Sequence, residues 1–174
     1  MSRYPWRRSI VLGLTAVLGP ISAPGQGAIA TGAVEVRVTD HRAGIGDFAA
    51  LEVELVEVAL HPRGQTRGQA WVPVLDRAPA VDLVPLKNGR SAPVGTARVT
   101  AGRYDAVRVR LGEIRARLKA GGVAAVTPLP STVALDLRVV SDRVSGILID
   151  LYVEDVSDHA PGHYTLKIKG VTAQ

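Results

Sequence analysis

The sequence has no cysteine, and its 174 residues include only one phenylalanine, two tryptophans and four tyrosines. Without cysteine the fold contains no disulfide bond, so its stability must come from the burial of apolar side chains. Aromatic residues make up only 4% of the chain, which is too few to form a stacking platform for nucleic-acid bases. The apolar run over residues 9–18 falls well short of the roughly 20 residues that a membrane-spanning helix requires.

The first 30 residues have the order of features that is typical of a secretory signal peptide. Arg3, Arg7 and Arg8 form a basic start, residues 9–18 are apolar and small, and Ala28-Ile29-Ala30 fits a cleavage site of A-x-A type. The alternative is an ordinary N-terminal hydrophobic strand. Arg7-Arg8 matches a twin-arginine signal only weakly, so the general secretion route is favoured. We therefore expect residues 1–30 to be removed and the protein to be exported, as a periplasmic or extracellular domain without a membrane span.

The formal net charge of +5 overstates how basic the exported chain would be. Three of the 21 basic residues lie before position 31 and none of the 16 acidic ones do, which leaves 18 basic residues against 16 acidic ones. Arginine and glutamate are interleaved along the expected strands. This pattern indicates a solvated sheet face and predicts no nucleic-acid partner.

Alternation of apolar and polar residues dominates the rest of the chain, most clearly over residues 100–118. There Val107, Val109 and Leu111 point one way while the residues between them point the other, as in a half-buried strand. The same period predicts strands at residues 34–38, 51–60, 71–75, 81–86, 92–99, 133–139, 147–153 and 164–168.

No helical periodicity follows residue 30, so each apolar face must pack on another sheet. We predict an all-β fold over residues 31–174: a single antiparallel β-sandwich of transthyretin-like or immunoglobulin-like type, with roughly eight to ten strands. A phase slip within residues 51–60 predicts a β-bulge. Tyr104, two residues after Gly102, is expected to bond the backbone at a strand corner.

The order of several short motifs resembles a known family. The motifs are a strand ending at Asp40, Trp71-x-x-x-Leu75, Val81-Asp82-Leu83-x-x-Leu86-x-Asn88-Gly89, Ala101-Gly102-x-Tyr104, Leu148-Ile149-Asp150-Leu151 and Gly162-x-Tyr164-x-Leu166-Lys167. Over about residues 32–169 the chain resembles domain of unknown function 4382, a family of secreted bacterial and archaeal proteins. The resemblance implies an exported sandwich of transthyretin-like or fimbrial-subunit-like type, often anchored as a lipoprotein, with no established activity. This chain departs from the family at His41-Arg42, where a proline is usual, and in lacking a cysteine for lipid attachment.

Four aspartates are candidate ligands for a calcium ion. Asp40 and Asp47 flank a glycine-rich loop, and Asp150 and Asp155 precede the last loop, so their oxygens would gather if these loops met at one end of the sandwich. The alternative is ordinary turn chemistry, in which aspartate bonds its own backbone. A pair of histidines, 159 and 163, lies nearby, but Pro161-Gly162 between them prevents the helix that would align their rings.

Four other residues are candidates for ligand binding. Trp71 and Tyr152 could stack on sugar rings, and Arg108 and Arg110 could bind an acidic polysaccharide. The alternatives are that Trp71 covers the core or an edge, and that the arginines pair across strands with Glu52, Glu54 or Glu113.

No catalytic motif is present: no serine lies in a G-x-S-x-G context, and Gly44-x-Gly46 lacks the rest of a phosphate-binding loop. We therefore expect a non-enzymatic exported domain, without a cofactor, that binds carbohydrate or protein at the cell surface. The alternative is a structural subunit of a surface filament or matrix, assembled by strand addition with residues 31–38 as the donated strand. A hydrolase is the third hypothesis.

Overall fold

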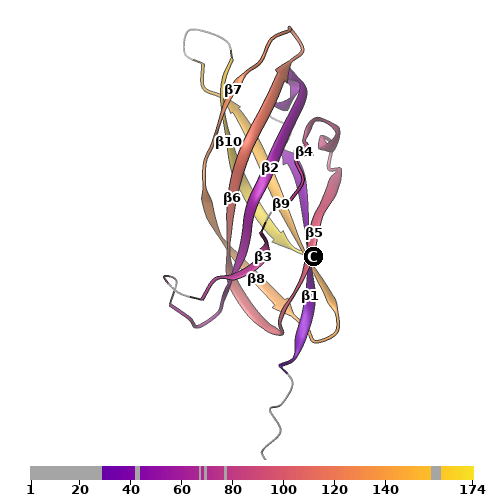
Figure 1. Ribbon diagram of the computed structural model, residues 1–174, viewed down its shortest axis with the longest axis vertical. Coiled ribbons are helices and arrows are strands. Elements are labelled where there is room, and N and C mark those ends of the chain that lie inside the picture. Colours follow the sequence, from indigo (N-terminus) through magenta and orange to yellow (C-terminus); the bar gives the residue numbers. More distant parts are fainter. Residues whose placement is uncertain (1–28, 42–43, 67, 69, 77, 158–161) are drawn as a thin grey trace, which may run out of the picture.

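The computed structural model describes residues 29–41, 44–66, 68, 70–76, 78–157 and 162–174. Within these residues, ten strands form two sheets that face each other, with two short 3-10 turns between strands (Figure 1). The predicted all-β sandwich is confirmed, as is the predicted number of strands. None of the described residues belongs to a helix that is long and apolar enough to cross a membrane.

The first sheet, sheet A, has the strand order β5-β1-β9-β10-β7. The strands are β5 (Ser91–Thr100), β1 (Thr31–His41), β9 (Val144–Asp155), β10 (His163–Ala173) and β7 (Ala125–Pro128). β1 and β5 are antiparallel, as are β9 and β10, but β1 runs parallel to β9 and β7 parallel to β10. The prediction of a wholly antiparallel sandwich is therefore wrong for these two pairs. Alternation shows which side chains are buried but carries no information on the direction of the neighbouring strand.

The second sheet, sheet B, has the order β3-β2-β6-β8, and β4 also pairs with β2. The strands are β3 (Val72–Leu75), β2 (Phe48–Pro62), β6 (Gly102–Leu118), β8 (Ser131–Val139) and β4 (Val81–Asp82). Its centre is the long antiparallel pairing of β2 with β6, which runs from Phe48 opposite Leu118 to Pro62 opposite Tyr104. Pro73 lies in the edge strand β3, where a residue without an N–H costs no ladder hydrogen bond.

The core lies between the sheets and consists of the apolar residues that the alternation predicted. The fully buried side chains include Val34, Val36, Val38, Val107, Val109, Ile147, Ile149, Leu151 and Val153. Phe48 closes one end of the core and meets Tyr164 edge to face, with ring centroids 4.7 Å apart. Tyr104 forms the predicted corner, because its hydroxyl donates a hydrogen bond of 2.7 Å to the carbonyl of Thr100.

The predicted bulge is present where β2 passes β6. The register shifts on both sides of Leu55, and Val56 is the extra residue between Leu55 and Glu57. Gly112 lies opposite this bulge, and a Cβ atom there would lie 2.5 Å from the Val56 side chain and 2.8 Å from Glu54. The bulge therefore requires a residue without a side chain on β6.

The strand predicted over residues 81–86 is wrong for most of its length. Only Val81 and Asp82 form a strand, and a 3-10 turn, η2 (Val84–Leu86), follows them. The reason is that Asp82 Oδ1 accepts hydrogen bonds from the backbone N–H groups of Leu51 and Val84, at 3.0 and 3.1 Å. This side-chain bond to Val84 competes with strand pairing and starts the turn.

The segment expected to be free for donation to a neighbouring molecule, residues 31–38, is instead part of a central strand. Every residue from Thr31 to Val38 is in register with β5, β9 or both. Val34, Val36 and Val38 contribute to the core of the same molecule. This pairing within the molecule weighs against the strand-donor form of the filament hypothesis. The expected signal peptide lies almost wholly outside the described residues and stays a prediction.

Candidate functional site

Three of the four predicted ligand-binding residues, Trp71, Arg108 and Arg110, meet on the outer face of sheet B. Both arginines are ion-paired with Glu57 of β2, Arg108 through Nε at 3.0 Å and Arg110 at 3.4 Å. Glu57 lies directly opposite Arg110 in the β2–β6 ladder. Cross-strand pairing of these arginines was expected, but with other glutamates. Glu57 offsets only one of the two positive charges, but its ion pairs with both arginines weaken the case that they bind an acidic polymer.

Trp71 covers a buried histidine that the sequence analysis did not identify. The His61 side chain is only 1% exposed, its ring lies 5.2 Å from that of Trp71, and its Nδ1 lies 2.7 Å from Asp105 Oδ1. The Arg108 guanidinium lies over the Trp71 ring at 4.6 Å. Trp71 thus packs against the protein itself, in agreement with the predicted role as an edge cover. His61 gives no sequence signal because it falls on the outward phase of β2, where a polar residue is ordinary.

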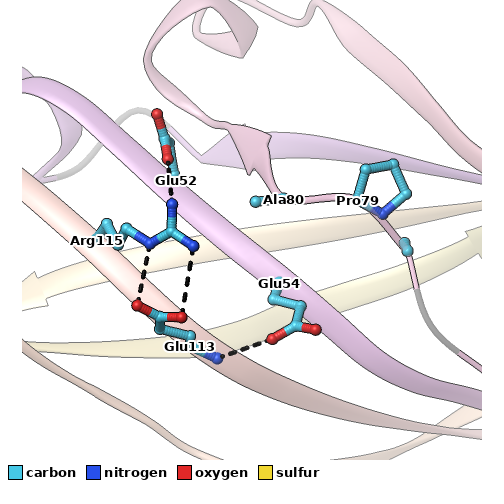
Figure 2. Close-up of a pocket in the computed structure, with 7 residues that line it drawn as sticks. Glu52, Glu54, Pro79, Ala80, Glu113 and Arg115 are labelled. Carbon is cyan, nitrogen blue, oxygen red and sulfur yellow. Dashed lines mark hydrogen bonds and ion pairs between the residues drawn. The ribbon is translucent and has the colours of Figure 1, made fainter.

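A hollow of about 470 Å³ lies further along the outer face of sheet B, between β2, β6 and the segment before β4 (Figure 2). Arg115 contacts Glu113 at 3.0 Å and Glu52 at 3.6 Å, and Glu54 lies beside them as an acceptor for the Glu113 N–H. The Arg115 hydrogen bond lowers the pKa of the Glu113 carboxyl below its usual value. Arg115 thus pairs across the strands with Glu52 and along β6 with Glu113, and no group within the described residues has the composition of a metal site. We assign no ligand to this hollow.

Tyr152, the fourth predicted residue, lies on the opposite outer face, that of sheet A. It points away from the core, because its neighbours Leu151 and Val153 are fully buried. The ammonium groups of Lys167 and Lys169 lie 4.9 and 5.3 Å from the centre of its ring. Lys167 and Lys169 are two residues apart in β10, so both lie on the same side of the strand.

Further charged groups extend this cluster across sheet A. The ring of His41, on β1, lies 5.8 Å from that of Tyr152, and its Nδ1 lies 3.3 Å from Asp150 Oδ2. Lys167 also donates a hydrogen bond of 2.6 Å to Glu154. We call Tyr152, His41, Asp150, Glu154, Lys167 and Lys169 the Tyr152 face. It combines one half-buried aromatic ring with hydrogen-bonding groups of both charges, drawn from three adjacent strands.

The four aspartates expected to gather for calcium have separate partners or none. Asp47 accepts a hydrogen bond from the Tyr164 hydroxyl at 3.3 Å, and Asp155 accepts one from the Ser157 N–H at 2.9 Å. The hydrogen bonds from Ser157 lower the pKa of Asp155. Asp155 therefore shows the turn chemistry that was the alternative to calcium. Residue 159 of the predicted histidine pair lies outside the described residues.

Asp40 is the exception, because it is buried without a hydrogen-bond partner. It follows Val34, Val36 and Val38 on the inward side of β1 and is 4% exposed, and neither carboxyl oxygen forms a hydrogen bond. Burial, together with the nearby charge of Asp150, raises the pKa of Asp40 from 3.8 to about 7. A carboxyl that is neutral below this pH costs less to bury than an ionised one.

Comparison with known protein families identifies the family of the chain. The family model "Domain of unknown function (DUF4382)" matches residues 31–168. The chain belongs to this family. The DUF4382 match runs from the first residue of β1 into β10 and so includes strands of both sheets. The resemblance inferred from the ordered motifs is thereby confirmed, while its transthyretin-like detail stays a prediction.

One solved structure similar to this DUF4382 chain is that of a "putative cell adhesion protein" from Bacteroides fragilis NCTC 9343. The two share 11% sequence identity, with a TM-score of 0.31. The match covers 81% of this chain and 45% of that one, so the present chain spans less than half the length of that protein. No curated protein matches the chain.

Proposed function

We propose that this DUF4382 chain is an exported, non-enzymatic domain that binds carbohydrate through the Tyr152 face. The observation that supports this most strongly is the ring of Tyr152, which lies on the outer surface of sheet A between groups that can donate and accept hydrogen bonds. The apolar C–H face of a sugar packs on an aromatic ring, while its hydroxyls need polar partners at the ring edge. The Tyr152 face offers both.

The position of this face in the sheet favours binding. β9 is paired on both sides and β1 lies between β5 and β9, while β10 is paired with β9 at Lys167, so these strands are held by their neighbours. A ligand would therefore meet a surface that is already ordered and would lose less free energy to ordering it.

The non-enzymatic part of the proposal is supported by the contacts of three serines near the ends of β8 and β9. The hydroxyl of Ser141 donates a hydrogen bond to Asp142, that of Ser145 to the carbonyl of Arg138, and that of Ser157 to the carbonyl of His163. None of these hydroxyl bonds is to a histidine ring, which a nucleophilic serine needs as its base.

The filament alternative would need a donated strand other than β1.

The test compares Tyr152→Ala with Trp71→Ala on a glycan array and then by calorimetric titration with any oligosaccharide that binds. We expect Tyr152→Ala to weaken binding about tenfold or more, as for an aromatic residue at the centre of a contact, with little change in melting temperature. Trp71→Ala is the matched control: it removes an aromatic side chain from the other face and should leave the affinity unchanged while lowering stability. Equal binding by Tyr152→Ala and the wild type, or no binding to any glycan, would contradict the proposal.

A further inference from the structure

Two arginines lie directly opposite each other on neighbouring strands of sheet B. Arg103 of β6 is in register with Arg138 of β8, and both side chains are exposed. Their neighbours Tyr104 and Leu137 are buried, so both guanidinium groups lie on the outer face of the sheet. Residues directly opposite in an antiparallel pair have Cβ atoms about 5 Å apart, and like charges there repel.

Within the described residues, neither arginine of this pair contacts a carboxylate. The arginines at positions 37, 63, 98, 108, 110 and 115 each contact a carboxylate. The nearby Asp136 contacts Arg63, and Asp105 is bonded to His61. Among the described residues Arg90, Arg117 and Arg143 also make no ion pair, but Arg90 and Arg143 lie outside the strands and Arg117 lies opposite Ala50. The Arg103–Arg138 pair therefore places two positive charges side by side in the ladder without a direct ion pair to either.

The pair borders a hollow that can hold a ligand. Its volume is about 510 Å³, and it is lined by Ala101, Gly102, Arg103, Arg138, Val139, Val140 and Ser141. Val140 is an exposed apolar residue on its rim. The hollow combines two positively charged guanidinium groups with the apolar residues Val139 and Val140. This lining suits a negatively charged group carried on a larger, partly apolar ligand.

We propose that Arg103 and Arg138 form a binding site for one oxyanion, a carboxylate or sulfate group carried by an acidic polysaccharide. Each guanidinium presents N–H donors in a planar fork that fits such a group bidentately. The bound oxyanion stabilises the pair because it replaces the repulsion of two cations by two charge-assisted contacts. This site lies on sheet B and does not depend on the Tyr152 face of sheet A.

The first experiment measures binding to three polymers at low and at moderate salt: dextran sulfate, polygalacturonate and neutral dextran. The wild type should bind at least one acidic polymer and not neutral dextran, and the two acidic polymers separate sulfate from carboxylate recognition. Arg103→Gln/Arg138→Gln should weaken that binding about tenfold or more, since contacts to charged groups are the strong ones. Arg117→Gln, which removes one positive charge at the other end of β6, should change it less than about twofold.

Three results would overturn the site: an equal loss in Arg117→Gln, an unchanged affinity in the double variant, or no binding to either acidic polymer at low salt. Tyr152→Ala should leave binding to these polymers intact, so failure of this site and failure of the Tyr152 face can be told apart.

The second experiment uses inorganic sulfate and thermal unfolding. Without sulfate, Arg138→Gln should melt higher than the wild type, because it removes the repulsion, whereas Arg117→Gln should not. Added sulfate should raise the melting temperature of the wild type more than that of Arg138→Gln. A lower melting temperature for Arg138→Gln in the absence of sulfate, or equal sulfate effects in both proteins, would contradict an uncompensated pair.

Discussion

Asp40 occupies an inward position that its strand otherwise gives to valine, and its carboxyl has no hydrogen-bond partner. Because its pKa is about 7 when folded and 3.8 in its ordinary state, the folded protein binds this proton more tightly than the unfolded chain does. The contribution of Asp40 to stability is therefore complete below about pH 4 and is lost as the pH rises through 7. The full difference corresponds to roughly 4 kcal/mol.

Asp40→Asn tests this directly. The amide has nearly the same shape and cannot ionise, so the variant should be more stable than the wild type at pH 8, with the difference growing between pH 4 and pH 8. Urea unfolding at several pH values measures it. The quantity to compare is the free energy of unfolding of the wild type minus that of the variant, because this difference removes the pH dependence of the other carboxyls. A difference that does not change with pH would show that Asp40 is ionised or solvated throughout.

Gly112 is required by packing and not by an unusual backbone angle. Gly112→Ala would place a methyl group 2.5 Å from Val56 and 2.8 Å from Glu54, so we expect a loss of about 1–3 kcal/mol in the free energy of unfolding. Gly102→Ala, at the start of the same strand, is the control, because no atom lies within 4 Å of its Cβ position. Similar unfolding free energies for the two variants would mean that the bulge at Val56 adjusts without cost.

Among the elements, β1 shows what alternation can and cannot predict. The pattern of Val34, Val36 and Val38 correctly predicted a strand with one buried face. It could not predict that β1 lies between β5 and β9 or that it runs parallel to β9, because one strand's periodicity does not specify its partners. The short strand β7 was missed for a related reason: four residues with alternating partial exposure give too weak a pattern.

Hydrogen exchange tests the position of β1. Amides of a strand with neighbours on both sides open only in large unfolding events, so those of β1 should exchange as slowly as those of β9 and far more slowly than those of the edge strand β7. Exchange of the β1 amides at the rate of β7 would indicate that β1 detaches, and would restore residues 31–38 as a strand that can be donated.

For the molecule as a whole, the two outer faces differ in chemistry. Sheet B carries a ladder of arginine–glutamate pairs, with Trp71 held against His61 and Arg108. Sheet A carries the Tyr152 face. The sequence indicated Trp71 and Tyr152 as equal candidates, because residue type alone does not show what an aromatic ring contacts. Only the fold separates a ring that packs on its own protein from one that lies on a surface with polar groups around it.

The most direct test of this account is to map the contact surface of a bound neutral oligosaccharide by NMR on the isotopically labelled domain. The account predicts that chemical-shift changes centre on Tyr152, Lys167 and Lys169 and extend to His41 of β1, with little change around Trp71. Changes centred on sheet B, or spread evenly over the protein, would contradict the assignment of carbohydrate binding to the outer face of sheet A.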